Sequence, residues 1–186
     1  MKRLVLVLAV LLCAIVAPAA RAQSDLGLKN LGVAIGYVSP ENLDGTFSFG
    51  GFADWGKMAP NIGLETRLDY WSWSESAFGA ETSVHDFTVG ARGKYYFATS
   101  NPKVRPFAGT GLAIHFIGSE VTIPASPGFP AMTAKDSQNK LGLDLGGGIA
   151  TPINERTDFL GEAWFGIVSD VSQFSLRAGL SYKLGH

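Results

Sequence analysis

The chain has 186 residues, with 15 basic and 16 acidic side chains and a single cysteine, Cys13. This length suits one domain. The near balance of charge excludes the strongly basic surface that nucleic-acid binding requires, so we expect no nucleic-acid partner. One cysteine cannot form a disulfide within the chain.

Residues 1–22 have the layout of a cleavable secretory signal peptide. Residues 2–3 are basic, an apolar run covers residues 4–16, and residues 20–22 (Ala-Arg-Ala) form a small-residue cleavage site. The apolar run is shorter than the roughly 20 residues of a membrane-spanning helix, so we predict export and cleavage. Cleavage would leave residues 23–186 as one domain with 12 basic and 16 acidic residues and no cysteine.

Eight later segments alternate between apolar residues and polar or small residues, which is the period of a β-strand. The last one is the clearest, because Leu176, Leu180 and Tyr182 alternate with Arg177 and Ser181. Clusters of turn-forming residues separate the segments. The predicted strands cover residues 30–38, 46–55, 62–73, 86–97, 105–116, 140–150, 158–168 and 174–184. The second strand loses strict alternation at residues 50–51 (Gly-Gly), where we predict a β-bulge.

Each predicted strand is close to the 9 to 11 residues that a tilted strand needs to cross a bilayer. Beyond the signal no apolar stretch approaches the length of a spanning helix, so a membrane-embedded form must consist of strands. Most predicted connections are short, whereas residues 74–85 and 118–139 are predicted to be long loops. Short turns on one side and long loops on the other are typical of outer-membrane barrels. We therefore predict an all-β fold, an eight-stranded antiparallel up-and-down transmembrane β-barrel.

Alternation alone also fits a soluble ligand carrier, in which the apolar face lies inside. Here the polar face consists mainly of Gly, Ala and Ser with a few charges, which suits the narrow interior of an eight-stranded barrel. Aromatic residues such as Trp55, Tyr95 and Tyr182 lie near strand ends, as in the girdles at a membrane boundary. We predict that the apolar face meets lipid.

With this orientation the charged residues of the polar face point into the lumen. Unpaired charges in such a place are costly, so we predict acid–base pairs across the barrel. The predicted lumen network consists of Glu65, Arg67, Asp69, Arg92, Lys94, Asp144, Glu162 and Arg177, with Lys183 near the strand end. This network either fills the lumen or forms a gated ion path, and the narrow interior favours the first.

Two motifs that could carry chemistry do not do so. Residues 146–148 (Gly-Gly-Gly) lie within a predicted strand, and neither a Lys-Ser/Thr pair nor a helix start follows to hold a phosphate. His85, His115 and His186 are too far apart in sequence to show a metal-ligand spacing. We predict no cofactor, no metal and no catalytic residue.

One enzymatic alternative stays open. His115 lies close in sequence to Ser119 and Glu120 near a predicted rim of the barrel. A nucleophile and a base at the membrane surface would suit a lipid A-modifying enzyme, which we rank third because sequence proximity does not establish a site.

The predicted loop 118–139 is a candidate for contact with an extracellular partner. Pro124, Pro127 and Pro130 interrupt its apolar residues, so we predict that it cannot extend as a regular hairpin. It either binds a partner or is a mobile surface loop.

Residues 105–112 (Arg-Pro-Phe-Ala-Gly-Thr-Gly-Leu) and 141–149 (Leu-Gly-Leu-Asp-Leu-Gly-Gly-Gly-Ile) resemble the fifth and sixth strands of the outer-membrane β-barrel protein family. That family includes the small OmpA-like and OmpX-like barrels, and the resemblance covers essentially the whole exported chain. It implies a monomer in the bacterial outer membrane, in contact with outer-membrane lipids and lipopolysaccharide. A C-terminal peptidoglycan-binding domain, found in larger OmpA-like proteins, is absent from the sequence.

The end of the chain is similar to the terminal signal that the barrel-assembly machinery recognises in this family. The matching residues are Arg177, Gly179, Tyr182 and Leu184, although two more residues follow where many members end on an aromatic.

These observations predict a structural or surface-interaction scaffold with a salt-bridged, closed lumen. The alternative is a narrow channel for small or apolar solutes, and a lipid A-modifying enzyme is the third candidate.

Overall fold

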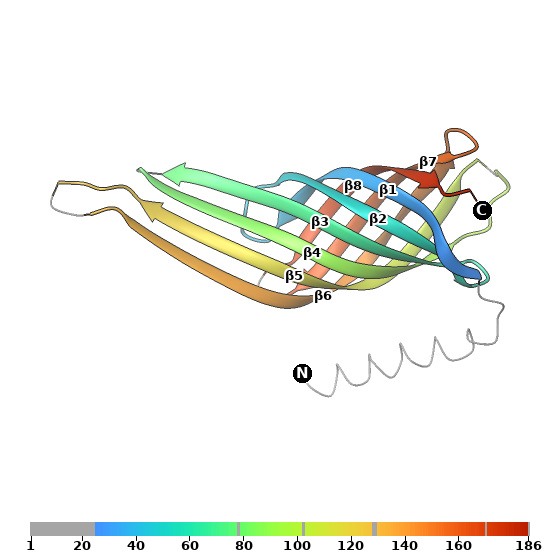
Figure 1. Cartoon of the computed structure of the whole chain (residues 1–186), viewed down its shortest axis with the longest axis horizontal. Coiled ribbons are helices and arrows are strands. Elements are labelled where there is room, and N and C mark those ends of the chain that lie inside the picture. Colours follow the sequence, from blue (N-terminus) through green and yellow to red (C-terminus); the bar gives the residue numbers. More distant parts are fainter. Residues whose placement is uncertain (1–24, 78, 102, 128–129, 170, 186) are drawn as a thin grey trace, which may run out of the picture.

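The computed structural model describes residues 25–77, 79–101, 103–127, 130–169 and 171–185. These residues form one antiparallel sheet closed into a barrel (Figure 1). Its strands are β1 (Asp25–Pro40), β2 (Thr46–Ala59), β3 (Ile62–Ala77), β4 (Ala80–Tyr96), β5 (Arg105–Ile123), β6 (Met132–Pro152), β7 (Thr157–Val168) and β8 (Gln173–Lys183). The predicted fold, an eight-stranded up-and-down barrel, is confirmed. The predicted signal peptide, residues 1–22, lies outside the described residues.

Pairing of the first strand with the last closes the barrel. The β1–β8 ladder runs from Asn30 opposite Lys183 to Pro40 opposite Gln173. Asp25 and Lys183 therefore lie at one end of the barrel, here called the terminal end, and the opposite end is called the far end (Figure 1). Among the described residues there is no helix long and apolar enough to cross a membrane.

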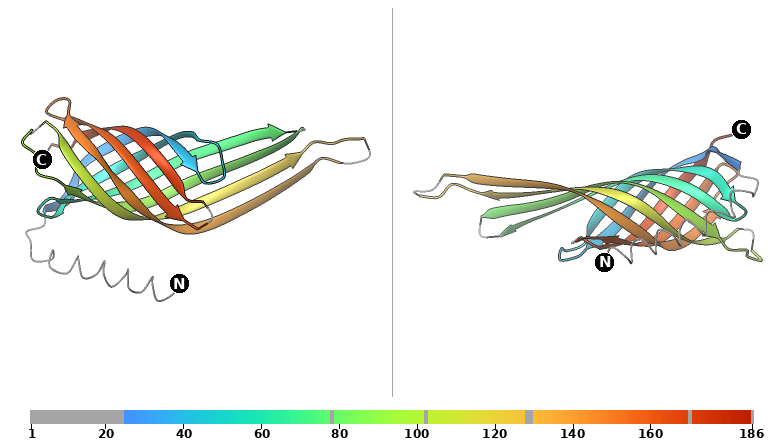
Figure 2. Two further views of the ribbon diagram at one scale, coloured as in Figure 1. Left: turned by 180° about the vertical axis from the view of Figure 1, so that it is seen from behind. Right: turned by 90° about the horizontal axis from the view of Figure 1, so that it is seen from below.

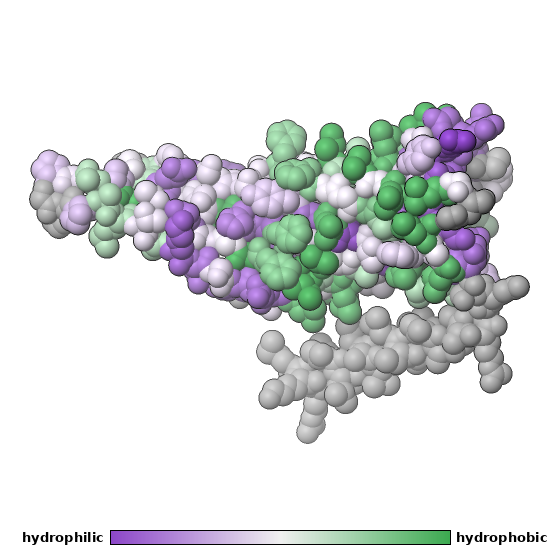
Figure 3. Space-filling view, in the orientation of Figure 1, coloured by the Kyte–Doolittle hydropathy of each residue, from purple (hydrophilic) through white to green (hydrophobic). Residues whose placement is uncertain are grey.

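The apolar side chains of the barrel point outward. Val33 and Ile35 of β1 are 66% and 71% exposed, whereas Ala34 between them is buried. Hydrophobic side chains gather over the barrel body on the face that Figure 3 shows. Exposed aromatic residues near the terminal end are Trp55, Tyr95, Phe97, Phe159 and Tyr182, and those nearer the far end are Tyr37, Phe47, Phe87, Phe116, Phe165 and Phe174. This arrangement matches a hydrocarbon-facing band between two aromatic girdles.

The predicted bulge at Gly50-Gly51 is wrong. Strand β2 keeps its register with β1 and with β3 through both glycines. Alternation is also kept, because Phe49 points outward and Phe52, three positions on, points inward. The irregularity lies instead between Asp54 and Lys57, where Gly56 has a φ of 81°. A positive φ suits glycine, which has no Cβ to clash in that conformation.

The two predicted long loops, residues 74–85 and 118–139, are also wrong. Strands β3 and β4 continue in register up to the pair of Ala77 and Ala80, and β5 and β6 continue up to the pair of Ile123 and Met132. Strands β4 and β5 pair over the same stretch. Four strands thus extend beyond the rest of the barrel at the far end, as all three views show (Figures 1 and 2).

The prolines do not prevent this extension, because they lie beyond it. Pro124, Pro127 and Pro130 all follow the last residue of β5 and precede the first residue of β6. A proline removes a ladder hydrogen bond only where it sits within a strand. These prolines therefore end the hairpin and do not interrupt it.

A small apolar cluster, here called the apolar plug, lies in the terminal half of the interior. The ring of Phe52 packs with Ala34, Ala150 and Leu160 in a buried cluster. A Cβ on Gly32 of β1 would overlap the Phe52 ring and would lie 2.6 Å from the carbonyl oxygen of Leu180. Glycine at position 32 is thus required by the close approach of this ring.

We expect the Gly32→Ala variant to be destabilised by about 1–3 kcal/mol, because the added methyl group overpacks the plug against Phe52. The matched control is Gly27→Ala on the same strand, where the new Cβ would meet no described atom within 4 Å. Urea unfolding in lipid vesicles, followed by tryptophan fluorescence, measures both changes. Equal midpoints for the two variants would contradict the expectation.

Candidate functional site in the barrel lumen

A cluster of three arginines and two aspartates occupies the middle of the lumen. Arg67 contacts Asp69 two residues along β3, and its Nη2 lies 2.7 Å from Oδ2 of Asp144 on β6. Arg92 Nε on β4 lies 3.1 Å from the same Asp144 oxygen. Arg177 Nη2 on β8 lies 2.9 Å from Oδ1 of Asp69. The cluster therefore joins strands on opposite walls of the barrel.

A second cluster lies beside the first, toward the terminal end. Lys94 Nζ donates to Glu65 Oε2 at 2.5 Å and to Glu162 Oε1 at 2.7 Å, which links β3, β4 and β7. Trp164 Nε1 donates to the other oxygen of Glu162 at 3.3 Å. The Trp164 ring also lies 3.8 Å from the Arg92 guanidinium carbon, a cation–π contact that joins the two clusters.

All eight residues of the predicted network point into the lumen, and every one takes part in these ion pairs. Alternation explains their placement, because side chains two residues apart on a strand share a face. The set contains four basic and four acidic side chains, so its charge is balanced. A balanced, fully paired network can remain charged in a narrow interior at an acceptable cost in desolvation.

Lys183 lies at the rim and does not join these clusters. Its Nζ is 2.9 Å from Oδ1 of Asp158, whose other carboxylate oxygen accepts from Arg105 Nη2 at 2.5 Å. Nearby, the Asn30 amide donates to Asp54 at 2.8 Å. Neither Asp158 nor Arg105 was predicted from the sequence to take part in the network. Both residues lie at the beginning of a strand, and strand ends meet at the barrel rim. That position could have predicted a contact between them.

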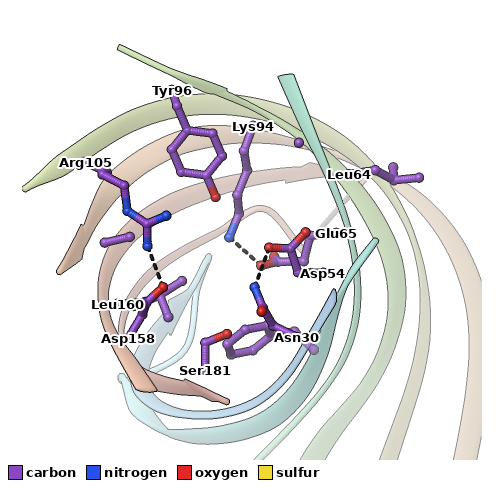
Figure 4. A pocket seen from close by; sticks show the side chains of 13 residues that line it. Asn30, Asp54, Leu64, Glu65, Lys94, Tyr96, Arg105, Asp158, Leu160 and Ser181 are labelled. Atoms are coloured by element: carbon purple, nitrogen blue, oxygen red, sulfur yellow. Dashed lines mark hydrogen bonds and ion pairs between the residues drawn. The ribbon is translucent and has the colours of Figure 1, made fainter. Parts of the chain in front are cut away.

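A small cavity opens between these rim residues and the second cluster (Figure 4). Its polar lining includes Tyr96, Glu65 and Ser181, and Phe52 and Leu160 line its apolar side. It has room for about 30 Å³, the space of roughly two water molecules. A cavity of this size and polarity suits bound water better than an organic ligand.

A third buried cluster lies toward the far end of the lumen. His115 Nδ1 lies 2.7 Å from Oδ2 of Asp86, and the Thr88 hydroxyl lies 3.1 Å from both groups. Each of the three side chains is almost fully buried. Asp86 was not assigned to the network from the sequence, because the predicted strand began at that residue.

The mouth above this cluster is closed by apolar residues and one hydrogen bond. Val38, Trp71 and Val168 are buried there, and Trp71 Nε1 donates to Gln173 Oε1 at 3.0 Å. From the apolar plug to this closure, ion-pair clusters and apolar side chains occupy the lumen, apart from the small cavity beside the second cluster.

The structure does not assemble the residues of the enzymatic alternative into a catalytic site. The His115 ring is held inside the barrel by Asp86, whereas Ser119 lies four residues along β5, about 13 Å away. Glu120 points to the opposite face and lies 2.9 Å from Lys135. A nucleophile and its base must lie within hydrogen-bond reach, which this spacing prevents. In the described part of the chain, no group of three or more His, Cys, Asp or Glu side chains could hold a metal ion.

The residues of the predicted assembly signal all lie on or beside β8. Arg177 and Gly179 point into the lumen and are buried, and Tyr182 points outward and is 48% exposed. Leu184 follows the strand, and its N–H donates to the Lys29 carbonyl at 2.8 Å.

Comparison with known protein families shows to which family this barrel belongs. The outer membrane protein beta-barrel domain family matches residues 5–183. The chain belongs to this family. It is thus a bacterial outer-membrane β-barrel, and its outward apolar face is the face that meets hydrocarbon. Among curated proteins, no sequence matches.

Solved structures share the fold at low sequence identity. Neisserial surface protein A (NspA) is 16% identical, with a TM-score of 0.62 over 84% of this chain and 97% of that one. The N-terminal barrel of Pseudomonas aeruginosa OprF is 14% identical, with a TM-score of 0.54 over 85% and 99%. Ail, the attachment invasion locus protein of Yersinia pestis, is 12% identical, with a TM-score of 0.54 over 85% and 100%.

We expect the Asp144→Asn variant to lose about 3–5 kcal/mol of stability, because it leaves the buried guanidinium groups of Arg67 and Arg92 without their shared carboxylate. The control is Glu120→Gln, which breaks the exposed pair with Lys135 and should cost less than about 1 kcal/mol. Urea unfolding of the two variants in the same vesicles gives both values. A loss for Asp144→Asn no larger than that of the control would show that the network does not stabilise the barrel.

Proposed function

We propose that this outer-membrane barrel is a surface-interaction scaffold, in which a closed barrel anchors a projecting sheet outside the membrane. The projecting sheet consists of residues 72–77, 80–85, 118–123 and 132–137, the parts of β3 to β6 that extend past the last barrel row. With six residues per strand it rises about 20 Å above the mouth. The terminal end then faces the periplasm, since long connections of such barrels are extracellular.

The observation that carries this proposal is an inversion of polarity along the four strands. The last barrel row carries Tyr70, Phe87 and Phe116 on the outer side of β3, β4 and β5, and Asn139 on that of β6. Above that row, the same side of the sheet carries no large apolar residue. Its members are Ser72, Ser74, Ser76, Glu81, Ser83, His85, Gly118, Glu120, Thr122, Thr133, Lys135 and Ser137. An outer face of this composition belongs in water, so the sheet has left the hydrocarbon.

The projecting sheet also has two free edges. Pairing of β3 with β2 begins at Trp71, and pairing of β6 with β7 begins at Gly142, so the parts beyond those residues lack a neighbour on one side. Unpaired strand edges offer backbone donors and acceptors to another chain. Surface attachment is consistent with the name of Ail, one of the structures that share this fold.

Shortening the projecting sheet tests the proposal. Replacing residues 74–83 and 120–135 each by Asn-Gly keeps the pairs Trp73 with Val84 and Ser119 with Asp136, so each hairpin closes on a two-residue turn. We expect a folded barrel, shown by heat-dependent gel mobility, that no longer supports attachment of expressing bacteria to epithelial monolayers or matrix-coated plates. The control replaces residues 41–44 in the β1–β2 connection. Attachment equal to that of the full-length protein would refute the scaffold role.

The narrow-channel alternative makes a different prediction. Because ion pairs and apolar side chains fill the lumen, we expect the protein to give no stable conductance steps in planar bilayers. Steps that appear in the wild-type protein and vanish in Arg92→Ala or Glu65→Gln would support a channel through the network and would contradict a closed lumen.

A further inference from the structure

The inner face of the projecting sheet is apolar, although it stands outside the membrane. It continues the lumen side of the barrel wall, and eight of its twelve residues are apolar: Trp73, Ala77, Ala80, Val84, Val121, Ile123, Met132 and Ala134. The other four are Glu75, Thr82, Ser119 and Asp136. Val121, Ile123 and Met132 are 38%, 49% and 64% exposed. An exposed apolar face of this kind marks a binding surface.

The opposite wall of the barrel is too short to cover this face. Strands β7 and β8 meet at the far end near Val168 and Gln173, and β1 and β2 meet near Pro40 and Thr46. The connections between them span only residues 169–172 and 41–45. The inner face thus rises beyond the far-end limits of β1, β2, β7 and β8 on the other side of the barrel (Figure 2).

A segment that docks on this face must satisfy its own backbone hydrogen bonds. Apart from those on the outer edges of β3 and β6, the N–H and C=O groups of the sheet are used within the ladders β3–β4, β4–β5 and β5–β6, and all of them point along the sheet and not out of its face. An extended peptide on the face would leave its own backbone unpaired against apolar side chains. An α-helix bonds its backbone internally, so it can present only side chains.

The dimensions of the face fit one helix. Four strands are separated by three gaps of about 4.8 Å, which gives a width of about 14 Å between β3 and β6. A helix with its side chains is about 10–12 Å across. The height of about 20 Å corresponds to roughly 13 helical residues, or between three and four turns.

The charges of the face select a cationic helix. Glu75 lies on the β3 edge and Asp136 on the β6 edge, one at each side of the apolar strip. Asp136 accepts a hydrogen bond from the amide of Gln138 at 2.8 Å. None of the twelve residues of the inner face is Lys or Arg. Basic residues that flank the apolar stripe of a helix would meet a carboxylate on both sides.

A second copy of this chain fits the face poorly. Two copies in one membrane each turn the inner face toward their own barrel, so the faces could meet only if the barrels overlapped. Two copies in facing membranes could meet, but the rotation that joins them places β3 opposite β3 and β6 opposite β6. Glu75 would then share an edge with Glu75, and Asp136 with Asp136, which is repulsive.

We propose that the inner face of the projecting sheet binds a cationic amphipathic helix of about 13 residues, which lies over the barrel mouth with its basic residues beside Glu75 and Asp136. This inference rests on the proposed function and names the chemistry of the partner. Helices with an apolar stripe and Lys or Arg on the polar side are typical of membrane-active peptides, a class that reaches the bacterial surface from outside.

The experiment uses a fluorophore at one of two neighbouring positions of β6 in the protein held in phosphatidylcholine nanodiscs. Ala134→Cys places the dye on the inner face, and Thr133→Cys places it on the outer face. The only natural cysteine, Cys13, lies in the predicted signal peptide. The probe is an 18-residue peptide of Leu and Lys with one apolar helical face, and its counterpart has Glu in place of Lys. We expect saturable binding of the Lys peptide reported by the inner dye alone.

Four pairs of substitutions identify the surface, two on the inner face and two matched controls on the outer face. Val121→Ser with Ile123→Ser changes the inner face, and Glu120→Ser with Thr122→Ser changes the outer face of the same strand. We expect the first pair to raise the Kd about tenfold or more and the second to leave it unchanged. Glu75→Gln with Asp136→Asn should also raise the Kd about tenfold, whereas Glu81→Gln with Glu120→Gln should not. An equal response of both dyes, equal Kd values across the variants, or equal binding of the Glu peptide would overturn the proposal.

Three further outcomes distinguish a failure of the helix site from a failure of the proposed function. If shortening the sheet abolishes bacterial attachment but the inner-face variants attach normally and no peptide binds, the scaffold role stands and the helix site falls. If nanodiscs pair in sedimentation through the inner face, a second copy covers it and the helix site is refuted. If the shortened protein attaches as well as the full-length one, the proposed function fails, whatever the peptide result.

Discussion

Closure of the sheet by the β1–β8 ladder is the constraint on which the rest of the structure depends. Hydrocarbon offers no hydrogen-bond partners, so each strand within the membrane must be paired on both sides. The ladder from Asn30 to Pro40 meets that requirement for the first and last strands. Closure with eight strands then fixes a narrow interior, and alternation sends every second side chain into it. The same alternation that covers the outside with Leu, Ile and Phe delivers arginine, lysine and carboxylate side chains to the inside.

The network of ion pairs follows from that geometry. Charged side chains inside a narrow barrel are stable only when each has an ion-pair partner. Here Asp144 pairs with both Arg67 and Arg92. Lys94 pairs with both Glu65 and Glu162. The pairs connect strands that are distant in sequence, so each one also holds opposite walls together. Trp164 contacts both clusters, because its ring lies against the Arg92 guanidinium and its Nε1 donates to Glu162. A lumen built in this way is a structural core made of polar side chains.

Much of the barrel could be predicted from the sequence, because a period of two fixes both the strands and the faces. The ion-pair partner of each charged residue could not be predicted from the sequence. It depends on the relative heights of strands, such as β3 and β6, that do not pair directly. The bulge was predicted at the wrong place because two successive glycines, Gly50 and Gly51, interrupt the apolar alternation of the sequence. In the structure these glycines continue the strand, where the absence of a side chain leaves space for Asp69 and for the β1 backbone. The extended hairpins were missed for a different reason. Residues 72–77 still alternate, but Trp73 falls on the face where the barrel strand carries polar residues.

This exchange of polar and apolar residues between the two faces of the sheet marks the membrane boundary. Between the row of Tyr70 and the row of Ser72, the outer side of the sheet turns from aromatic to polar while the backbone register continues without a shift. A strand in hydrocarbon must expose apolar side chains outward, and a strand in water has no such requirement. The apolar residues above the boundary are therefore not needed for insertion. They are retained on the inner face alone, over a closed mouth and between two carboxylates, which is the arrangement expected where a partner and not a lipid covers the surface.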